Sequence, residues 1–421
     1  MYYIKKVELQ IMEKEIVKLV NCLSQSKTAY NFINNIELPE GCAVVDNGFS
    51  KLEPNKSYFF KLSSSAGILV RTPKEVSPST GFNIVAAHTD SPALKLKPNY
   101  LIKDKHYTMI ATEVYGGPIV STWLDIPLSL AGRVFVKTSK GIEELEVNLK
   151  EPIFTIPNMP PHLERTINQG YKYNPQIDLN ALAPKDFNLE KYLGVEEGSI
   201  ISHDLFLVPE MDARVVGNEF VLSNRIDDLA CVFAGLEAFN ASVPTSKINI
   251  LCCFDNEEVG SRTKQGADST LLGDILDLIY ESFNYSQVDK LNALKNSFMI
   301  SADNAHAVNP NHPEKFDKLN SAYINEGLVI KFNANQSYTT DALSAASFID
   351  LCDSVKISHQ VLANRSDIRG GSTLGNIALS HVSIPSVDIG LPQLAMHSTM
   401  ETLGQQDVLD TIKVLKAFYS K

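Results

Sequence analysis

The sequence has few cysteines, no long apolar run and no excess of basic residues. Its six cysteines in 421 residues contain no Cys-x-x-Cys pair, so we expect buried, reduced thiols and no disulfide scaffold. No stretch reaches the roughly 18 apolar residues of a membrane span, and Lys and Glu interrupt residues 1–20, unlike the apolar core of a signal peptide. We therefore expect a soluble, cytoplasmic protein without a membrane partner.

The charge balance is acidic. Lys and Arg number 38 and Asp and Glu number 49, which gives a net charge of −11 and a pI near 5.4. Such a chain is a poor candidate for nonspecific binding to nucleic acid or to an anionic membrane. The excess of carboxylates has a second interpretation, because some of them could bind metal cations.

Apolar residues make up 44% and charged residues 21% of the chain, which excludes a disordered chain, a collagen-like fibre and a pure coiled coil. Buried-strand patterns at 82–87, 248–254 and 298–302 alternate with helical patterns, of which 13–36, 229–239 and 408–419 are examples. Strands that alternate with helices predict an α/β fold.

The segment from about residue 94 to residue 214 differs from the rest. Alternating residues around the turn at 139–141 predict a β-hairpin, and a proline-rich stretch follows at 157–184. Prolines at this density favour an ordered arm or a long loop. We interpret this segment as a β-rich unit inserted into the α/β domain.

Several apolar strands run directly into histidines or acids. His88 and Asp90 follow the first buried strand, Asp303 follows another, and His397 comes after the strand near 384–389. The adjacent pair Glu257-Glu258 follows the strand at 248–254, and the pair Asp227-Asp228 precedes a helix. In open α/β sheets such groups gather beyond the carboxyl ends of the strands.

Each of these residues also has an ordinary structural explanation. An isolated histidine at a strand end is more often a hydrogen-bonded structural residue, and an aspartate before a helix is more often a cap. The acids after strands fit a solvated loop or an Asx turn. That explanation would have to hold five times at equivalent places, whereas histidines and carboxylates together form a suitable ligand set for zinc or its neighbours.

A two-metal hydrolytic site needs a bridging aspartate, a histidine and a carboxylate for each ion, and a free carboxylate as base. The sequence contains this number of groups. Glu257 and Glu258 are adjacent and point in different directions, so one can bind metal while the other takes a proton from water. The pattern alone does not say which does which.

The motifs resemble the aspartyl aminopeptidase family of dinuclear metallo-exopeptidases, which includes the vacuolar-type aminopeptidases. The resemblance covers nearly the whole chain, in order. The matching stretches are AAHTDSPALKLKP (86–98), EVYGGP (113–118), AGRV (131–134), IPN (156–158), HLER (162–165), NRIDDLA (224–230), DNEEVGS (255–261), SADNAHAVNPNHPEKF (301–316), IKFNANQSYTTDA (330–342), GGSTLGN (370–376) and VDIGLPQLAMHS (387–398).

The resemblance implies a three-layer α/β/α metallo-exopeptidase domain at residues 1–93 and 216–421. Residues 94–215 would form an inserted β-rich dimerisation domain. It further implies hydrolysis of single N-terminal residues from peptides by a hydroxide held between two divalent ions. Zinc is the expected ion, with cobalt or manganese as alternatives.

The family pattern also assigns roles to individual residues. The metal ligands would be His88 and Asp303 for one ion and Glu258 and His397 for the other. Asp227 would bridge the ions, and Glu257 would be the general base. Asp90 would orient His88, because a His-x-Asp spacing in a strand places both side chains on one face.

The substrate-binding residues implied by the resemblance are His162, Lys331, His306 and Tyr338. Lys331 would pair with an acidic N-terminal side chain, although an edge-strand surface lysine is an equal alternative from the sequence. His162 would reach from one subunit into the site of its neighbour, within dimers that assemble into a tetrahedral dodecamer.

Some positions depart from the family pattern. Asp228 stands where the family commonly has Asn, so it competes with Asp227 for the bridging position. Met400 and Ile126 stand where arginines are frequent, which leaves the choice between acidic and neutral substrates open. Two other functions remain as alternatives: a related metal-dependent amidohydrolase or deacylase, and a non-catalytic protein that forms the same shell.

Overall fold

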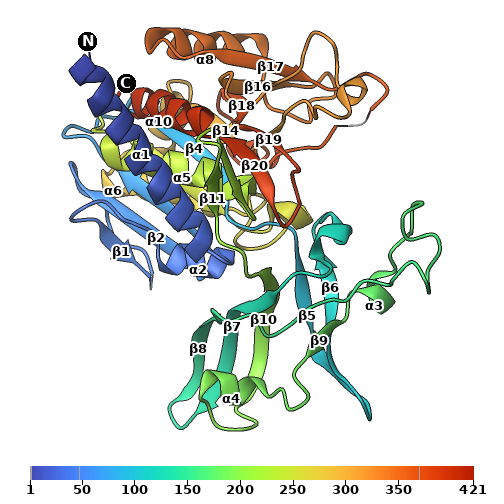
Figure 1. The fold of residues 1–421 in the computed structure, drawn as a ribbon. Helices are drawn as coiled ribbons and strands as arrows, with labels where there is room; N and C mark the ends of the chain where they lie inside the picture. The colour runs from blue at the N-terminus through green and yellow to red at the C-terminus, as the bar shows by residue number, and fades with distance from the viewer. Residues whose placement is uncertain (1, 47, 369) are drawn as a thin grey trace.

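The computed structural model describes residues 2–46, 48–368 and 370–421. Figure 1 shows a main body of sheet and helices with a separate, smaller sheet beneath it. Within the described residues, the main sheet has nine strands in the spatial order β1 (Ala43–Val45), β2 (Ser57–Ser63), β3 (Ala66–Arg71), β13 (Ile248–Phe254), β4 (Phe82–His88), β14 (Phe298–Ala302), β18 (Ser386–Gly390), β16 (Leu328–Phe332) and β17 (His359–Ala363).

The centre of this sheet consists of strands with both faces buried. All seven residues of β4 and all seven of β13 are buried, which explains why these strands read as continuous apolar runs and not as alternating patterns. Neighbouring residues of β4 point to opposite faces, so Ile84 packs in one core and Val85 in the other.

Helices cover both faces of the main sheet. One face carries α1 (Tyr2–Gln25), α5 (Ile226–Ala241), α8 (Ala342–Ser354) and α10 (Gln405–Tyr419). The other face carries α6 (Leu271–Ser282), α7 (Gln287–Leu294) and α9 (Leu374–Leu379). The predicted three-layer α/β/α fold is therefore confirmed.

The smaller sheet in the lower part of Figure 1 comes from the middle of the chain. In the part of the chain that the structure describes it has six strands in the order β8 (Gly141–Asn148), β7 (Leu128–Thr138), β10 (Ile200–Pro209), β5 (Ala93–Lys103), β6 (Thr108–Tyr115) and β9 (Ala181–Ala183). The predicted hairpin is the antiparallel pair β7 and β8. The domain boundaries at 93/94 and 215/216 stay predictions.

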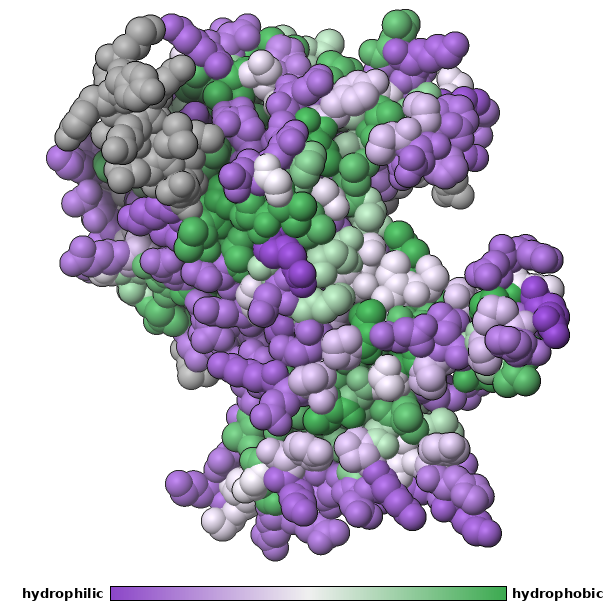
Figure 2. Space-filling view, in the orientation of Figure 1, coloured by the Kyte–Doolittle hydropathy of each residue, from purple (hydrophilic) through white to green (hydrophobic). Residues whose placement is uncertain are grey.

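Between β8 and β9 the chain forms an extended arm. It contains turns over 161–170 and the short helix α3 (Pro175–Asp178), which begins after the cap Asn174 with a proline in its first turn. Figure 1 shows this segment standing away from the rest of the molecule. In Figure 2 the surface is hollowed between the arm and the main body.

A third sheet lies beside the central one and carries residues close to the site. Its strands, among the residues described, are β11 (Arg214–Val216), β12 (Phe220–Ser223), β20 (Glu401–Gly404), β19 (Pro392–Leu394) and β15 (Ala305–His306), in this order. β12 leads directly into α5, and β19 and β20 flank the loop that holds His397.

One predicted element is wrong in extent. The apolar pattern predicts a single helix over 13–36, but the structure has α1 followed by a separate α2 (Ala29–Asn34). Thr28 caps α2 by accepting a hydrogen bond from the Asn31 backbone N–H at 3.4 Å, and this cap starts a new helix direction. None of the helices in the described ranges is long and apolar enough to cross a membrane.

Candidate metal centre

Neighbouring strands deliver the site residues to one edge of the central sheet. β13, β4, β14 and β18 lie side by side and run parallel. His88 ends β4 and Asp303 follows β14, while Glu257 and Glu258 lie after β13 in the short helix η2 (Glu257–Val259). Because parallel strands share one carboxyl edge, these side chains lie close together.

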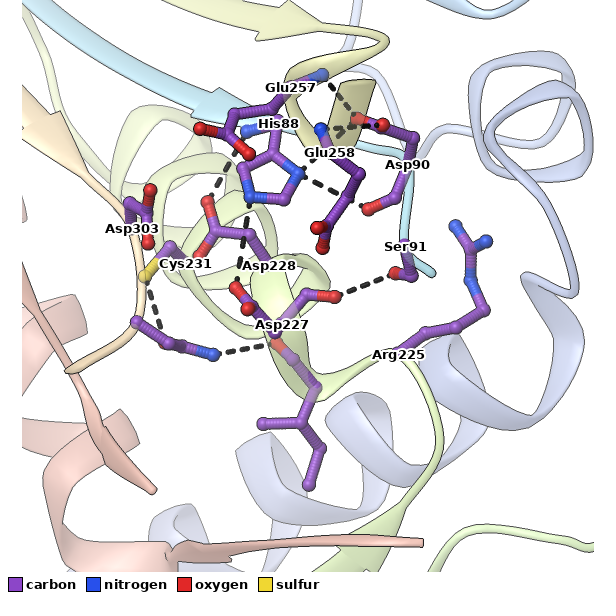
Figure 3. A network of polar contacts seen from close by, with 12 residues as sticks. His88, Asp90, Ser91, Arg225, Asp227, Asp228, Cys231, Glu257, Glu258 and Asp303 are labelled. Carbon is purple, nitrogen blue, oxygen red and sulfur yellow. Dashed lines mark hydrogen bonds and ion pairs between the residues drawn. The ribbon is translucent and has the colours of Figure 1, made fainter. Parts of the chain in front are cut away.

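Asp227 and His397 enter the same region from irregular backbone. Asp227 lies in the first turn of α5 with φ −81° and ψ 110°, outside the helical region. His397 lies between β19 and β20 with φ 70°. Figure 3 shows the side chains of His88, Asp227, Glu258 and Asp303 turned toward a common space.

The geometry contains two groups of three potential ligand atoms each. His88, Asp227 and Asp303 form one group, and Asp227, Glu258 and His397 form the other. Within each group the donor atoms all lie within 4.8 Å of one another. Asp227 belongs to both: one of its oxygens lies 3.7 Å from His88 Nε2 and the other 3.5 Å from His397 Nε2.

Two carboxylate oxygens of this cluster find no hydrogen-bond partner among the residues that the structure describes. Asp227 Oδ1 and Glu258 Oε1 are both buried without a donor. An unpaired buried acceptor costs about 1–3 kcal/mol, and more when it is charged. A bound divalent ion would satisfy both oxygens, so the residues present fit a metal centre made of imidazole and carboxylate groups.

Both histidines present Nε2 to the cluster and use Nδ1 for support. His88 Nδ1 lies 3.2 Å from the Asp90 carbonyl oxygen and 3.3 Å from its carboxylate. His397 Nδ1 lies 2.9 Å from the carbonyl oxygen of Gly117. An acceptor at Nδ1 favours the tautomer whose Nε2 lone pair is free for a metal ion.

Asp90 connects this histidine to the loop that carries the glutamates. Its carboxylate accepts hydrogen bonds from the backbone N–H of Glu257 at 3.0 Å and of Glu258 at 3.2 Å, and from the Tyr115 hydroxyl at 2.8 Å. Burial acts to raise the pKa of Asp90, but His88 and Tyr115 outweigh it, so the pKa is lowered overall. Asp90 is therefore ionised and tied to three elements at once.

Glu257 belongs to neither group of potential ligands, unlike its neighbour Glu258. None of the hydrogen bonds found among the described residues engages its carboxylate, and the residue is half-buried. Burial, together with the nearby charges of Asp303, Asp90 and Asp227, raises the pKa of Glu257 to about 7 against the opposing effect of His88. A carboxyl group with such a pKa can both take up and release a proton near neutral pH.

Asp228 has a different orientation from Asp227. It is fully buried, and its Oδ2 accepts a hydrogen bond from the backbone N–H of His88 at 3.2 Å. It belongs to neither group of potential ligands. The geometry therefore favours Asp227 over Asp228 as the shared carboxylate.

Lys331 lies beside the cluster and not on the surface. β16 lies between β18 and β17, and Lys331 is 3% exposed. Its Nζ donates to Asp303 Oδ1 at 3.2 Å and lies 5.5 Å from the ring centroid of Tyr338. The alternative of an edge-strand surface lysine is therefore wrong.

The other two substrate-binding candidates are exposed. His306, in the short strand β15, has an exposed side chain. His162 lies in the turns of the arm and is also exposed, and no hydrogen bond or ion pair among the described residues joins it to the cluster. Within one chain the structure does not bring His162 to the metal centre.

Sequence reasoning missed Glu401, a buried acid that touches two ligand loops. Its oxygens accept the backbone N–H of Asp227 at 3.1 Å and that of His397 at 2.7 Å. Burial and the charge of Asp227 raise the pKa of Glu401 to about 8, although both backbone donors act to lower it. The only signal in the sequence was an acid four residues after the predicted ligand His397.

A mixed α/β sheet whose central strands run parallel, with paired histidines and carboxylates at their carboxyl edge, defines the class of metal-dependent hydrolases. The chain belongs to the M18 family within that class: the family model "Aminopeptidase I zinc metalloprotease (M18)" matches residues 23–191 and 187–419. The chain is therefore a zinc aminopeptidase by family, and the predicted enzyme class is confirmed.

Known relatives extend over nearly the whole chain. A probable M18 family aminopeptidase 2 of Clostridium acetobutylicum is 42% identical over 427 residues, covering 96% of this chain and 98% of the relative. A chain of the cryo-EM structure of the Ape4 and Nbr1 complex is 29% identical with a TM-score of 0.92, covering 97% of this chain and 86% of that one. The S. cerevisiae mApe1 dodecamer, 22% identical with a TM-score of 0.82 and 97% coverage of both chains, shares the fold.

Proposed function

We propose that the chain removes single N-terminal residues from peptides at a centre that holds two divalent metal ions. The observation that carries this proposal is the pair of ligand groups that share Asp227. His88 and Asp303 would bind one ion. Glu258 and His397 would bind the other, and Asp227 would bridge the two. Zinc is the first choice for such nitrogen and oxygen donors, with cobalt or manganese as alternatives.

When bound, the metal ions would polarise the scissile carbonyl and lower the pKa of water. Glu257 would take the proton from the attacking water as general base and pass it to the leaving amine as general acid. Its unengaged carboxylate at the edge of the cluster and its pKa of about 7 support this role. Asp90 would keep the His88 ring in the orientation that its metal contact requires.

The charge of Lys331 supports a preference for acidic N-terminal residues. Burial acts to lower the pKa of this lysine, but the charge of Asp303 and further acids raise it overall, so the ammonium group keeps its proton. Tyr338 flanks it, and His306 has an exposed side chain. An Asp or Glu side chain of the substrate would pair with this fixed cation.

The arm supports self-association. Met159, Leu163 and Ile177 are 45%, 73% and 69% exposed on the arm that also carries His162. Exposed apolar side chains that cluster on one segment indicate a contact surface. We propose that residues 94–215 form a dimerisation domain, that His162 enters the site of a neighbouring subunit, and that the dimers assemble into a closed dodecamer like that of mApe1.

The test of the proposed reaction is Glu257→Gln in the full chain, with metal content and turnover measured on the same preparation. We expect zinc content equal to that of the parent and kcat lowered by about 100- to 10,000-fold. Glu281→Gln, an exposed glutamate on α6, is the matched control and should keep full activity.

The substrates in this assay should be aminoacyl amides with acidic and neutral residues, together with N-acyl amino acids. Cleavage of the N-acyl amino acids but not of the aminoacyl amides would indicate that the chain acts as a deacylase and not as an aminopeptidase. Near-normal turnover by Glu257→Gln would remove Glu257 from the role of base. A parent protein that retains no divalent metal would contradict the proposed centre.

A further inference from the structure

A series of four buried, hydrogen-bonded side chains ends at Glu401, which contacts the backbone of two proposed metal ligands. Cys231, Asn304, Gln393 and Glu401 are each no more than 2% exposed. The Cys231 thiol donates to Asn304 Oδ1 at 3.2 Å, the Asn304 amide donates to Gln393 Oε1 at 2.8 Å, and the Gln393 amide donates to Glu401 Oε1 at 3.4 Å. In this series each side chain donates to the next one, and the last acceptor is the carboxylate of Glu401.

The backbone donors that meet Glu401 belong to two of the proposed metal ligands. The N–H of Asp227 and the N–H of His397 each donate to one of its oxygens. Among the described residues, the Glu401 oxygens are the acceptors that these two N–H groups have. Neither N–H takes part in regular helix or sheet hydrogen bonding, because Asp227 has non-helical dihedrals and His397 has a positive φ. Without Glu401 both donors would be buried and unpaired.

Glu401 itself is fixed by the third sheet. It is the first residue of β20 and pairs with Ser223 of β12, the strand that leads into α5. β20 also follows the loop of His397. One rigid strand thus supplies an acceptor to both irregular segments, although Asp227 lies 174 residues away in the sequence.

We propose that Glu401 is a positioning residue, which sets the separation of the bridging carboxylate Asp227 and the imidazole of His397 by holding both of their backbones. This inference rests on the metal centre proposed above. Outer groups that orient metal ligands typically contribute 10- to 100-fold to metal affinity. Gln393 and Asn304 would hold the Glu401 carboxylate in turn, and Asn304 directly follows the ligand Asp303.

The experiment is a zinc titration of the metal-free full chain against a chromophoric chelator, with parent and Glu401→Gln side by side. The amide places an NH₂ group against one of the two backbone N–H donors. We expect the zinc dissociation constant to rise by about 10- to 100-fold, and the visible absorption spectrum of the cobalt-loaded variant to differ from that of the parent.

Asp407→Asn is the matched control. Asp407 is also a buried carboxylate that accepts two backbone N–H groups, from Asn325 at 2.6 Å and Gly327 at 3.1 Å, but it lies outside the cluster. We expect a lower melting temperature and an unchanged zinc affinity, since its role is structural alone. Glu401→Asp, which keeps two acceptor oxygens, should fall between parent and Glu401→Gln and serves as the test if the amide variant does not fold.

The outcomes separate the two proposals. If Glu401→Gln bound zinc as tightly as the parent and showed the same cobalt spectrum, that result would overturn the positioning role and leave the metal centre intact. If only Glu401→Asp folds, the same result in that variant counts equally. A parent chain that binds neither zinc nor cobalt would overturn the metal centre first, and the positioning role with it.

Discussion

Lys331 combines burial with a retained charge. Its ammonium group donates to Asp303, a proposed metal ligand, and lies over the ring of Tyr338. A buried cation needs a partner, because a lone charge in the interior is costly. Asp303 supplies one partner, and an acidic side chain of the substrate would supply a second.

We expect Lys331→Met to lower kcat/KM for substrates with N-terminal Asp or Glu by about 10- to 100-fold relative to Leu, since a hydrogen bond to a charged group contributes about 1.5–3 kcal/mol. The ratio between the two substrate types is the measurement, because damage to the metal centre would lower both equally. Lys290→Met, at another buried lysine paired with Asp277, should leave the ratio unchanged. An unchanged ratio in Lys331→Met would remove Lys331 from substrate selection.

At the residue scale the sequence predicts best those groups whose place follows from strand order. His88 and Asp303 could be placed at one edge because parallel strands share that edge. Glu401 and Gln393 could not, because their partners are backbone N–H groups and amides of distant segments. A residue pattern contains no information on which backbone donors stay unpaired after folding.

At the scale of elements, an ion-pair network within the smaller sheet lies where this sheet meets the main body. Asp204 on β10 pairs with Lys95 on β5 at 2.8 Å and with Arg133 on β7 at 3.0 Å. The Arg133 guanidinium also lies 4.6 Å from the ring centroid of Tyr30 in α2. The same residues line a cavity of about 240 Å³ that extends to His397, so this junction lies close to the site.

Burial acts to raise the pKa of Asp204, but Lys95 and Arg133 lower it below its usual 3.8. A carboxyl group with a depressed pKa stabilises the fold above pH 3.8, and this stabilisation is lost as the pH falls through its folded value. We expect Asp204→Asn to cost about 1–2 kcal/mol, a value reduced for partial exposure, with a melting temperature about 1–3 °C lower.

The difference in melting temperature between parent and Asp204→Asn should be the same at pH 7 and at pH 5, because Asp204 is ionised at both. Asp186→Asn, at an exposed position of the same sheet's loops, should show no such difference. If the difference in melting temperature between parent and Asp204→Asn disappeared between pH 7 and pH 5, this would contradict a lowered pKa of Asp204.

The succession of elements could be predicted where burial is periodic or continuous. β4, β13 and β14 match the apolar runs because each run is buried on both faces. The break between α1 and α2 could not be predicted in the same way, because tertiary contacts help to fix it. The Asn31 amide, for example, donates to Glu146 of β8 at 2.6 Å. Residues 26–28 are the polar stretch Ser-Lys-Thr, but apolar residues resume at 29–33 with helical spacing, so the pattern suggests one helix where the structure has two.

At the scale of the whole molecule, the arm is the part whose proposed role depends on a second chain. It carries His162 and exposed apolar residues, yet no hydrogen bond or ion pair in the described part of one chain joins this histidine to the metal centre. A site completed by the neighbouring subunit would make assembly a condition for activity, and symmetry would repeat that completion around the shell.

Mixed oligomers test this arrangement directly. His162→Ala alone should lower kcat by about 100- to 1,000-fold if it stabilises the oxyanion, and Glu257→Gln alone is expected to be inactive. In oligomers reassembled from equal amounts of both, a site works when an intact Glu257 meets an intact His162 of its neighbour. Random mixing gives this pairing at roughly a quarter of the sites, so activity should rise well above that of either variant.

The control is a mixture of Glu257→Gln with His88→Ala. Both residues lie in the cluster of one chain, so no pairing of subunits restores a site, and this mixture should stay inactive. If His162 worked within its own chain, its mixture with Glu257→Gln would stay equally inactive, because each chain would carry one defect in its own site. The gain in the first mixture and its absence in the second are together specific to a histidine that acts across a subunit interface.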